Sequence, residues 1–299
     1  MISLKIIILP ALMKSVQSLN WFLFIVLSFI WGSSFILMKE GLHHLNAYQV
    51  ASLRMLSAGL VLLPIAIKKF KDFSRIEIQW ILLSGLLGSF IPAYLFCIAE
   101  TRINSALAGF LNSTTPILTM IIGAIIFRST FTKMKWIGVA TGLVGMTILF
   151  LSERADLTNF LFSLFILLAT ICYAFNANIA AAKLKSIGPT DIASIAFAML
   201  IPPSLIILIL TGFFSLPFND SGVLYSIGAS TLLGIAGTAF ATILFYRLLK
   251  RAGALFASMV TYGIPFVALM WGLIAGETIH VLPIAGLAII LFGVTLAKK

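Results

Sequence analysis

The side chains best suited to bind a small molecule lie near the middle of long apolar segments. Pro116 and Pro265 each interrupt such a segment. A proline has no N–H to donate to the carbonyl four residues earlier, so the carbonyls of Asn112 and Thr261 are freed. Free carbonyls in an apolar medium need a partner from protein, water or ligand. The prolines therefore predict two matched helix breaks, which either form a binding site that includes Tyr262 or are kinks satisfied by neighbouring hydroxyls.

A second set of candidates lies in two further apolar segments, where Trp31 corresponds to Tyr173 and Ser34 to Asn176. Trp31 lies about ten residues into its segment, or ~15 Å at 1.5 Å per residue, whereas membrane aromatics usually gather at the interfaces. An indole N–H at that depth needs a hydrogen-bond partner. These side chains are candidates for substrate binding, and Tyr94 is a further one; the alternative is that Trp31 packs between helices with a local hydrogen bond.

The elements that carry these residues are predicted to be membrane-spanning helices. The chain is 61% hydrophobic and only 10% charged, whereas a soluble domain has roughly 25% charged residues. This difference excludes an ordinary soluble enzyme. A spanning helix needs about 20 mainly apolar residues. Ten segments meet this requirement, at residues 21–38, 47–67, 78–98, 105–127, 134–151, 159–182, 191–212, 223–248, 253–274 and 279–297.

The positive charges predict the orientation of these spans. Of the twenty Lys and Arg residues, sixteen fall in segments on the N-terminal side of the membrane, three (Lys39, Arg102 and Arg154) fall on the other side, and one, Arg54, lies within a span. Cytoplasmic loops carry the excess of Lys and Arg, so we expect a multi-pass protein of a bacterial inner membrane with both termini in the cytoplasm. Residues 1–20 lack a small-residue cleavage site and are predicted to be a cytoplasmic lead-in; an interfacial helix is the alternative.

The two halves of the chain repeat one another. The residues from Ser33 align with those from Phe175, Pro116 aligns with Pro265, and several glycine pairs keep the same order: Gly85 and Gly88 with Gly234 and Gly237, and Gly138 and Gly145 with Gly286 and Gly293. Five helices are an odd number, so the second copy enters the membrane from the opposite side. The predicted fold is therefore all-α, with ten transmembrane helices in two inverted five-helix repeats at residues 21–151 and 159–297. Secondary transporters commonly have this architecture and bind substrate near the membrane midplane; a duplicated structural bundle is the alternative.

The sequence resembles the EamA family of the drug/metabolite transporter superfamily. The resemblance rests on WGSSFILMKEGL from Trp31, on ASLRMLSAGLVLLP around Arg54, and on Gly276-Glu277 before a last helix with spaced glycines. It covers about residues 21–297 and implies a ten-helix carrier with both termini inside, of a kind that often exports amino acids or other small metabolites. Two positions depart from a full duplication: Arg128 corresponds to Glu277, and Ala196 corresponds to Arg54.

Arg54 is the charge that lies well inside a span. Such residues are costly and are often functional. Two interpretations are open: Arg54 binds substrate, or it forms a structural pair, for which Glu100 at the end of the third span is the expected partner. The resemblance favours the structural pair, because the family often carries an arginine here. A paired Glu100 would have a lowered pKa, so we expect transport without obligatory proton coupling.

No catalytic or metal-binding pattern is present in the sequence. It has no HExxH, GxSxG or GxxxxGK[ST] motif, and the histidines fall in loops or at span ends. We therefore expect no enzyme activity, no cofactor, no metal and no nucleic acid, and a monomer or weak homodimer in the lipid bilayer. The predicted function is secondary transport, with export or exchange of small zwitterionic or neutral metabolites such as amino acids. The alternative is a non-transporting membrane protein, such as a lipid-modifying enzyme or an assembly partner.

Overall fold

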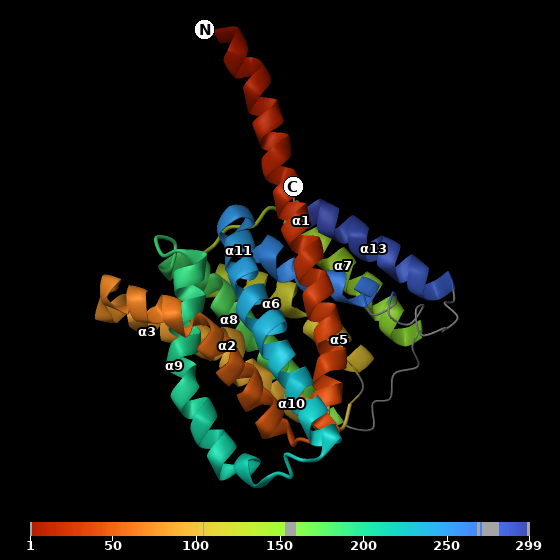
Figure 1. The fold of residues 1–299 in the computed structure, drawn as a ribbon. Coiled ribbons are helices and arrows are strands. Elements are labelled where there is room, and N and C mark those ends of the chain that lie inside the picture. Colours follow the sequence, from red (N-terminus) through yellow and green to blue (C-terminus); the bar gives the residue numbers. More distant parts are fainter. Residues whose placement is uncertain (1, 104, 153–159, 268–269, 271–280, 298–299) are drawn as a thin grey trace.

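The computed structural model describes residues 2–103, 105–152, 160–267, 270 and 281–297. Every element in these ranges is helical, as the apolar segments predict. Gly276 and Glu277 lie outside them. The helices form a bundle from which the N-terminal part of α1 projects (Figure 1). The first half contains α1 (Ile2–Leu42), α2 (Ala47–Lys69), α3 (Arg75–Gly85), α4 (Ile91–Ala99), α5 (Ser105–Asn112), α6 (Thr115–Ile125) and α7 (Lys133–Ser152). The second half contains α8 (Phe160–Lys183), α9 (Pro189–Leu210), α10 (Ser221–Gly234), α11 (Ala241–Ser258) and α13 (Val281–Ala297).

Seven of the described helical segments are long and apolar enough to cross a membrane. Six of them coincide with the predicted first to fourth, sixth and seventh spans. The seventh segment, Ser221–Val267, has 47 residues and contains the predicted eighth span and part of the ninth. Gly253 divides it with a φ of 86°, a left-handed backbone that favours glycine. The chain is therefore a multi-pass membrane protein, while the count of ten spans stays a prediction.

Local sequence explains where several helices begin. Asn46 precedes α2 and accepts a hydrogen bond from the Gln49 backbone, while the Gln49 side chain accepts one from the Asn46 backbone. Ser74 and Glu77 make the same capping box before α3. Such caps satisfy the free N–H groups of a first helical turn. Residues 2–20, the predicted lead-in, continue directly into the first span as part of α1.

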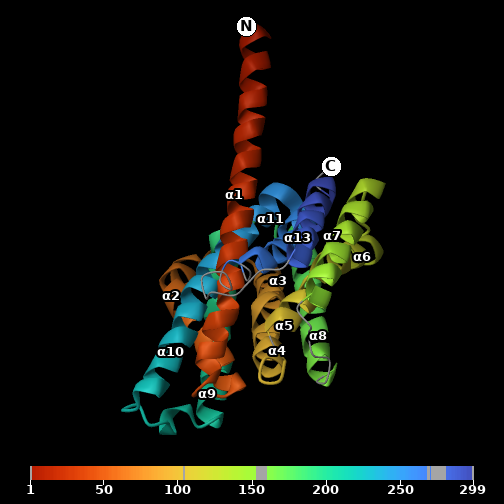
Figure 2. The ribbon, with the colours of Figure 1, turned by 90° about the vertical axis from the view of Figure 1, so that its right-hand side faces the viewer.

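The two halves interlock through matched helix pairs. The most extensive contacts join α7 to α13 and α2 to α9; α13 and α7 lie side by side in both views (Figure 2). Gly293 allows the first of these contacts, since a methyl group added to it would lie 2.6 Å from the Gly138 carbonyl oxygen. Small residues at such contacts let membrane helices approach closely. The predicted glycine matches therefore lie at helix contacts.

Two π-helical turns interrupt the bundle at matched places. One, η2 (Leu86–Phe90), joins α3 to α4, and the other, η4 (Ile235–Phe240), joins α10 to α11. Each begins just after a glycine of a matched pair, Gly85 or Gly234. A π-turn inserts an extra residue into a helix and is frequent at functional sites. Both turns face the centre of the bundle, where they line a cavity.

Candidate functional site

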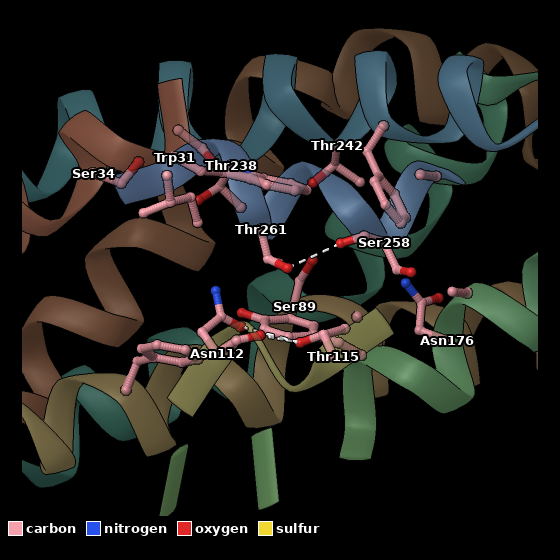
Figure 3. Close-up of a pocket in the computed structure, with 18 of the residues that line it drawn as sticks. Trp31, Ser34, Ser89, Asn112, Thr115, Asn176, Thr238, Thr242, Ser258 and Thr261 are labelled. Carbon is pink, nitrogen blue, oxygen red and sulfur yellow. Dashed lines mark hydrogen bonds between the residues drawn. The ribbon is translucent and has the colours of Figure 1, made fainter. Parts of the chain in front are cut away.

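A central cavity is lined by residues from both halves of the chain (Figure 3). The space that the lining residues enclose, together with the open solvent at the mouth, is about 910 Å³. The lining comes from α1, α2, α4, α5, α6, α8 and α11, together with η2, η4 and the 3-10 turn η5 (Met259–Gly263). Trp31 packs against Phe245 with ring centroids 5.6 Å apart, and Phe96 against Tyr173 at 6.1 Å. The walls therefore combine aromatic rings with uncharged polar groups.

Six of the eight predicted substrate-binding residues lie around this cavity. They come from four segments that are far apart in the sequence: Trp31, Ser34, Asn112, Tyr173, Asn176 and Thr261. The Trp31 indole donates to the Gly237 carbonyl at 3.2 Å, so its N–H is satisfied by protein. Its ring remains part of the cavity wall. The role of the six residues in binding stays a prediction.

The other two predicted residues point elsewhere. Tyr94 shares a 2.7 Å hydrogen bond with Ser52 on α2. Tyr262 is fully buried, and its hydroxyl donates to the Val139 carbonyl at 3.0 Å. Its ring lies against Gly142 on α7. Neither tyrosine is among the described residues that line the cavity.

Both proline-linked segments are interrupted beside the cavity. In the first half, α5 ends at Asn112 and α6 begins at Thr115, with Pro116 in its first turn. The Thr115 hydroxyl donates to the freed Asn112 carbonyl at 2.6 Å. In the second half, the 3-10 turn η5 separates α11 from the residues around Pro265. A neighbouring hydroxyl thus satisfies the first break, which nonetheless exposes Asn112 and Thr115 to the cavity.

The π-turns are site features that the sequence prediction missed. Gly88 in η2 approaches Asn176, and Gly237 in η4 approaches Ser34 so closely that an added methyl group would lie 2.7 Å from its hydroxyl oxygen. Since Gly88 corresponds to Gly237 and Asn176 to Ser34, the two contacts exchange equivalent positions. The matched glycines were visible in the sequence, but the extra residue in each turn has no sequence signature that we recognise.

Arg54 does not pair with Glu100, which corrects the predicted ion pair. Its Nε donates to the Thr238 hydroxyl at 2.6 Å, and Thr238 lies in η4. Arg54 itself is partly buried and lines the cavity. The π-turn brings a hydroxyl acceptor to this arginine, which is why the carboxyl group at the far end of α4 is not its partner.

Glu100, directly after α4, is buried and poorly hydrogen-bonded. It is 7% exposed, its Oε1 lacks a hydrogen-bond partner among the described residues, and its Oε2 accepts a long 3.5 Å bond from Ser105. Burial raises the pKa of Glu100 to about 8, while Lys39, Ser105 and Arg54 oppose this rise. The sequence predicted a lowered pKa for Glu100, and the structure gives a raised one. Desolvation of the buried carboxylate outweighs the attraction of the nearby positive charges.

Both halves of the chain match the same family of known proteins. Residues 19–151 and 161–298 match the EamA-like transporter family. The chain belongs to this family. It is a transporter of the EamA type, and the family is consistent with the drug/metabolite transporter superfamily.

Three of its relatives align with most of the EamA chain. A Salmonella typhimurium protein named probable amino-acid metabolite efflux pump is 28% identical, over 91% of this chain and 92% of its own. An uncharacterized transporter of Archaeoglobus fulgidus is 24% identical, over 94% and 99%. The Escherichia coli inner membrane transporter YedA is 25% identical, over 89% and 86%. One crystal structure has a TM-score of 0.70 at 16% identity, over 94% of this chain and 97% of the other, and so shows the same fold.

Proposed function

We propose that this EamA protein carries small zwitterionic or neutral metabolites, such as amino acids, across a bacterial inner membrane as an exporter or exchanger. The observation that supports the proposal is the central cavity, whose lining combines matched positions from both halves of the chain. A small metabolite bound there touches both halves. The name of the Salmonella relative, a probable amino-acid metabolite efflux pump, favours the same substrate class.

Alternating access between the two repeats is the proposed mechanism. The Gly88–Asn176 and Gly237–Ser34 contacts exchange equivalent positions, which supports a pseudo-twofold relation between repeats 21–151 and 159–297. In inverted-repeat carriers, one repeat moves against the other around a fixed central site. The N-terminal end of α1 and the C-terminal end of α13 project at the same end of the bundle (Figures 1 and 2). An even number of spans, with both termini in the cytoplasm, is consistent with this arrangement.

Counterflow tests the proposal directly. Purified protein is placed in liposomes loaded with one unlabelled amino acid or nucleoside, and the uptake of the same compound in labelled form is measured against protein-free liposomes. We expect transient accumulation of at least one amino acid. If no member of a broad panel of amino acids and nucleosides exchanges, the transport proposal for this class of compound is wrong.

A matched pair of variants assigns the exchange to the cavity. Ser89 lines the cavity and is labelled in Figure 3, whereas Thr147 is exposed on α7. Ser89→Phe places a ring in the cavity and should abolish exchange. Thr147→Phe adds the same ring on an outer face and should retain it. Equal exchange by both variants would place the transport path elsewhere.

A further inference from the structure

The cavity contains a guanidinium group whose hydrogen-bonding capacity is mostly unused. A guanidinium has five N–H donors and no acceptor. In Arg54, Nε donates to Thr238, and no other hydrogen bond or ion pair of this side chain occurs in the described part of the chain. Thr238 in turn donates its own proton to the Leu233 carbonyl at 3.2 Å. The Thr238 oxygen therefore acts as an acceptor that holds the guanidinium in place, and the terminal N–H groups stay available.

The lining of the cavity offers this charge no counter-ion. No aspartate or glutamate is among the described residues that form its walls. Glu100 is a carboxylic acid close enough to Arg54 to interact with its charge, but it lies outside the described lining. An uncompensated charge inside a membrane protein is costly, so an anionic partner supplied by a ligand would be favourable here.

The amide groups of the cavity also present free donors. The Asn176 side-chain oxygen accepts from Ser84 and, at 3.3 Å, from the Tyr246 hydroxyl. The Asn112 oxygen accepts from Thr115 at 3.3 Å. Both amide nitrogens lack a hydrogen bond within the described residues, and Figure 3 shows them directed toward the cavity. Donors that face the ligand favour an acceptor-rich group such as a carboxylate.

The hydroxyl groups complement these donors. Ser34 donates to the Ile30 carbonyl at 2.8 Å, Ser258 to the Leu255 carbonyl at 2.7 Å, and Thr261 to the Ser258 carbonyl at 3.1 Å. A hydroxyl that gives its proton to its own helix presents only lone pairs to its other neighbours. These oxygens are suited to accept from an ammonium or hydroxyl group of a ligand, without any acidic side chain.

We infer that Arg54 binds the carboxylate of the transported metabolite and thereby makes a carboxylate a requirement for transport. The inference deepens the proposed transport function and rests on it. It selects amino acids and similar monocarboxylates over neutral nucleosides, while the aromatic pairs Trp31–Phe245 and Phe96–Tyr173 suit an uncharged side chain. A phosphate ester carries more charge and is better matched by several cations, of which the described lining contains one.

The first test changes the ligand and leaves the protein intact. Binding to the purified full-length chain is measured by titration calorimetry for L-phenylalanine, L-leucine and L-threonine, each against its carboxamide at one pH. A hydrogen bond to a charged group is worth enough that we expect about ten- to a hundredfold weaker binding of each amide than of its acid. Equal binding of acid and amide would overturn the inference, and so would tighter binding of a phosphate ester such as phosphoserine than of serine.

The second test changes Arg54. Arg54→Gln should abolish the preference for acid over amide, and Arg54→Lys should keep part of it, because the charge remains without the planar fork. Arg251 provides a matched control, since its guanidinium also donates through Nε, to Asn20, but is exposed on α11. Arg251→Gln should keep the full preference. If folded Arg54→Gln still prefers the acid over the amide, the inference is wrong. If Arg54→Gln does not fold, the inference is tested by the acid and amide pairs on the wild type and by the reduced preference expected for Arg54→Lys.

The two proposals fail in different ways. If nucleosides or amines exchange in liposomes while no carboxylate does, transport stands and the role of Arg54 is wrong. If nothing exchanges, the transport function itself is wrong, and the inference about Arg54 fails with it.

Discussion

Replacing Glu100 by glutamine should change how the stability of the protein depends on pH. The folded protein keeps this carboxyl group buried, with a pKa of about 8 in place of the ordinary 4.5. Between these two values the folded state binds a proton that the unfolded state releases. Stability from this group is therefore present below about pH 4.5 and is lost as the pH rises toward 8.

The magnitude follows from the size of the pKa change. A pKa unit corresponds to about 1.4 kcal/mol, so the rise from 4.5 to about 8 corresponds to a loss on the order of 4–5 kcal/mol by alkaline pH. The pKa of about 8 already includes the lowering caused by Ser105 and Lys39. Glutamine has the shape of the protonated acid and carries no charge at any pH. Glu100→Gln should therefore be close to wild type in stability at pH 5 and clearly more stable at pH 9.

Thermal unfolding in detergent micelles, followed by tryptophan fluorescence from pH 5 to 9, measures this effect. We expect the melting temperature of the wild type to fall across the range by several degrees more than that of Glu100→Gln. Glu77→Gln is the control: Glu77 is exposed, and its hydrogen bonds to Ser74 lower its pKa, so it stays charged from pH 5 to 9 and its loss should shift both ends equally. Parallel curves for wild type and Glu100→Gln would refute the assignment of a raised pKa.

Three further predictions concern packing and coupling. Tyr262→Phe should lower the free energy of unfolding by about 0.5–1.5 kcal/mol, because it removes a buried hydrogen bond to the Val139 carbonyl, yet counterflow should persist, because Tyr262 does not line the cavity. Gly142→Ala should destabilise the protein by about 1–3 kcal/mol, because the added methyl group would overpack against the Tyr262 ring. Gly228→Ala on α10 is the control and should cause no such loss, because nothing lies within 4 Å of the added methyl group. Denaturant unfolding in micelles measures both effects. An imposed pH gradient, with equal substrate on both sides, should drive no uptake, since Glu100 lies outside the described lining of the cavity; accumulation abolished by Glu100→Gln would contradict this expectation.

Hydropathy was enough to predict the helical class and most of the described spans, because the length of an apolar run is a local property. The helix interruptions near Pro116 and Pro265 were also predictable, since the missing N–H of proline acts on its own helix. The family assignment followed from segments such as the one around Trp31, and the comparisons confirmed it.

Side-chain direction was much less predictable. Tyr94 and Tyr262 are polar aromatics in spans, as Tyr173 is, yet only Tyr173 lines the cavity. In a membrane both lipid and the protein interior are apolar, so hydrophobic periodicity does not fix which face of a helix points inward. The partner of Arg54 was missed for a related reason, because Thr238 lies in a π-turn that changes the register of its helix.

The two halves share their packing more fully than their chemistry. Gly85 packs against Ala196, and its counterpart Gly234 packs against the backbone of Arg54. Because Arg54 and Ala196 correspond, the same close helix contact is made twice, while the cation is present only once. Equivalent glycines therefore account for the repeated helix contacts. The positions where the halves differ make the two sides of the cavity chemically different. A carboxylate held by Arg54 would be bound from the α2 side alone, so the metabolite would lie in one orientation within a nearly symmetric frame.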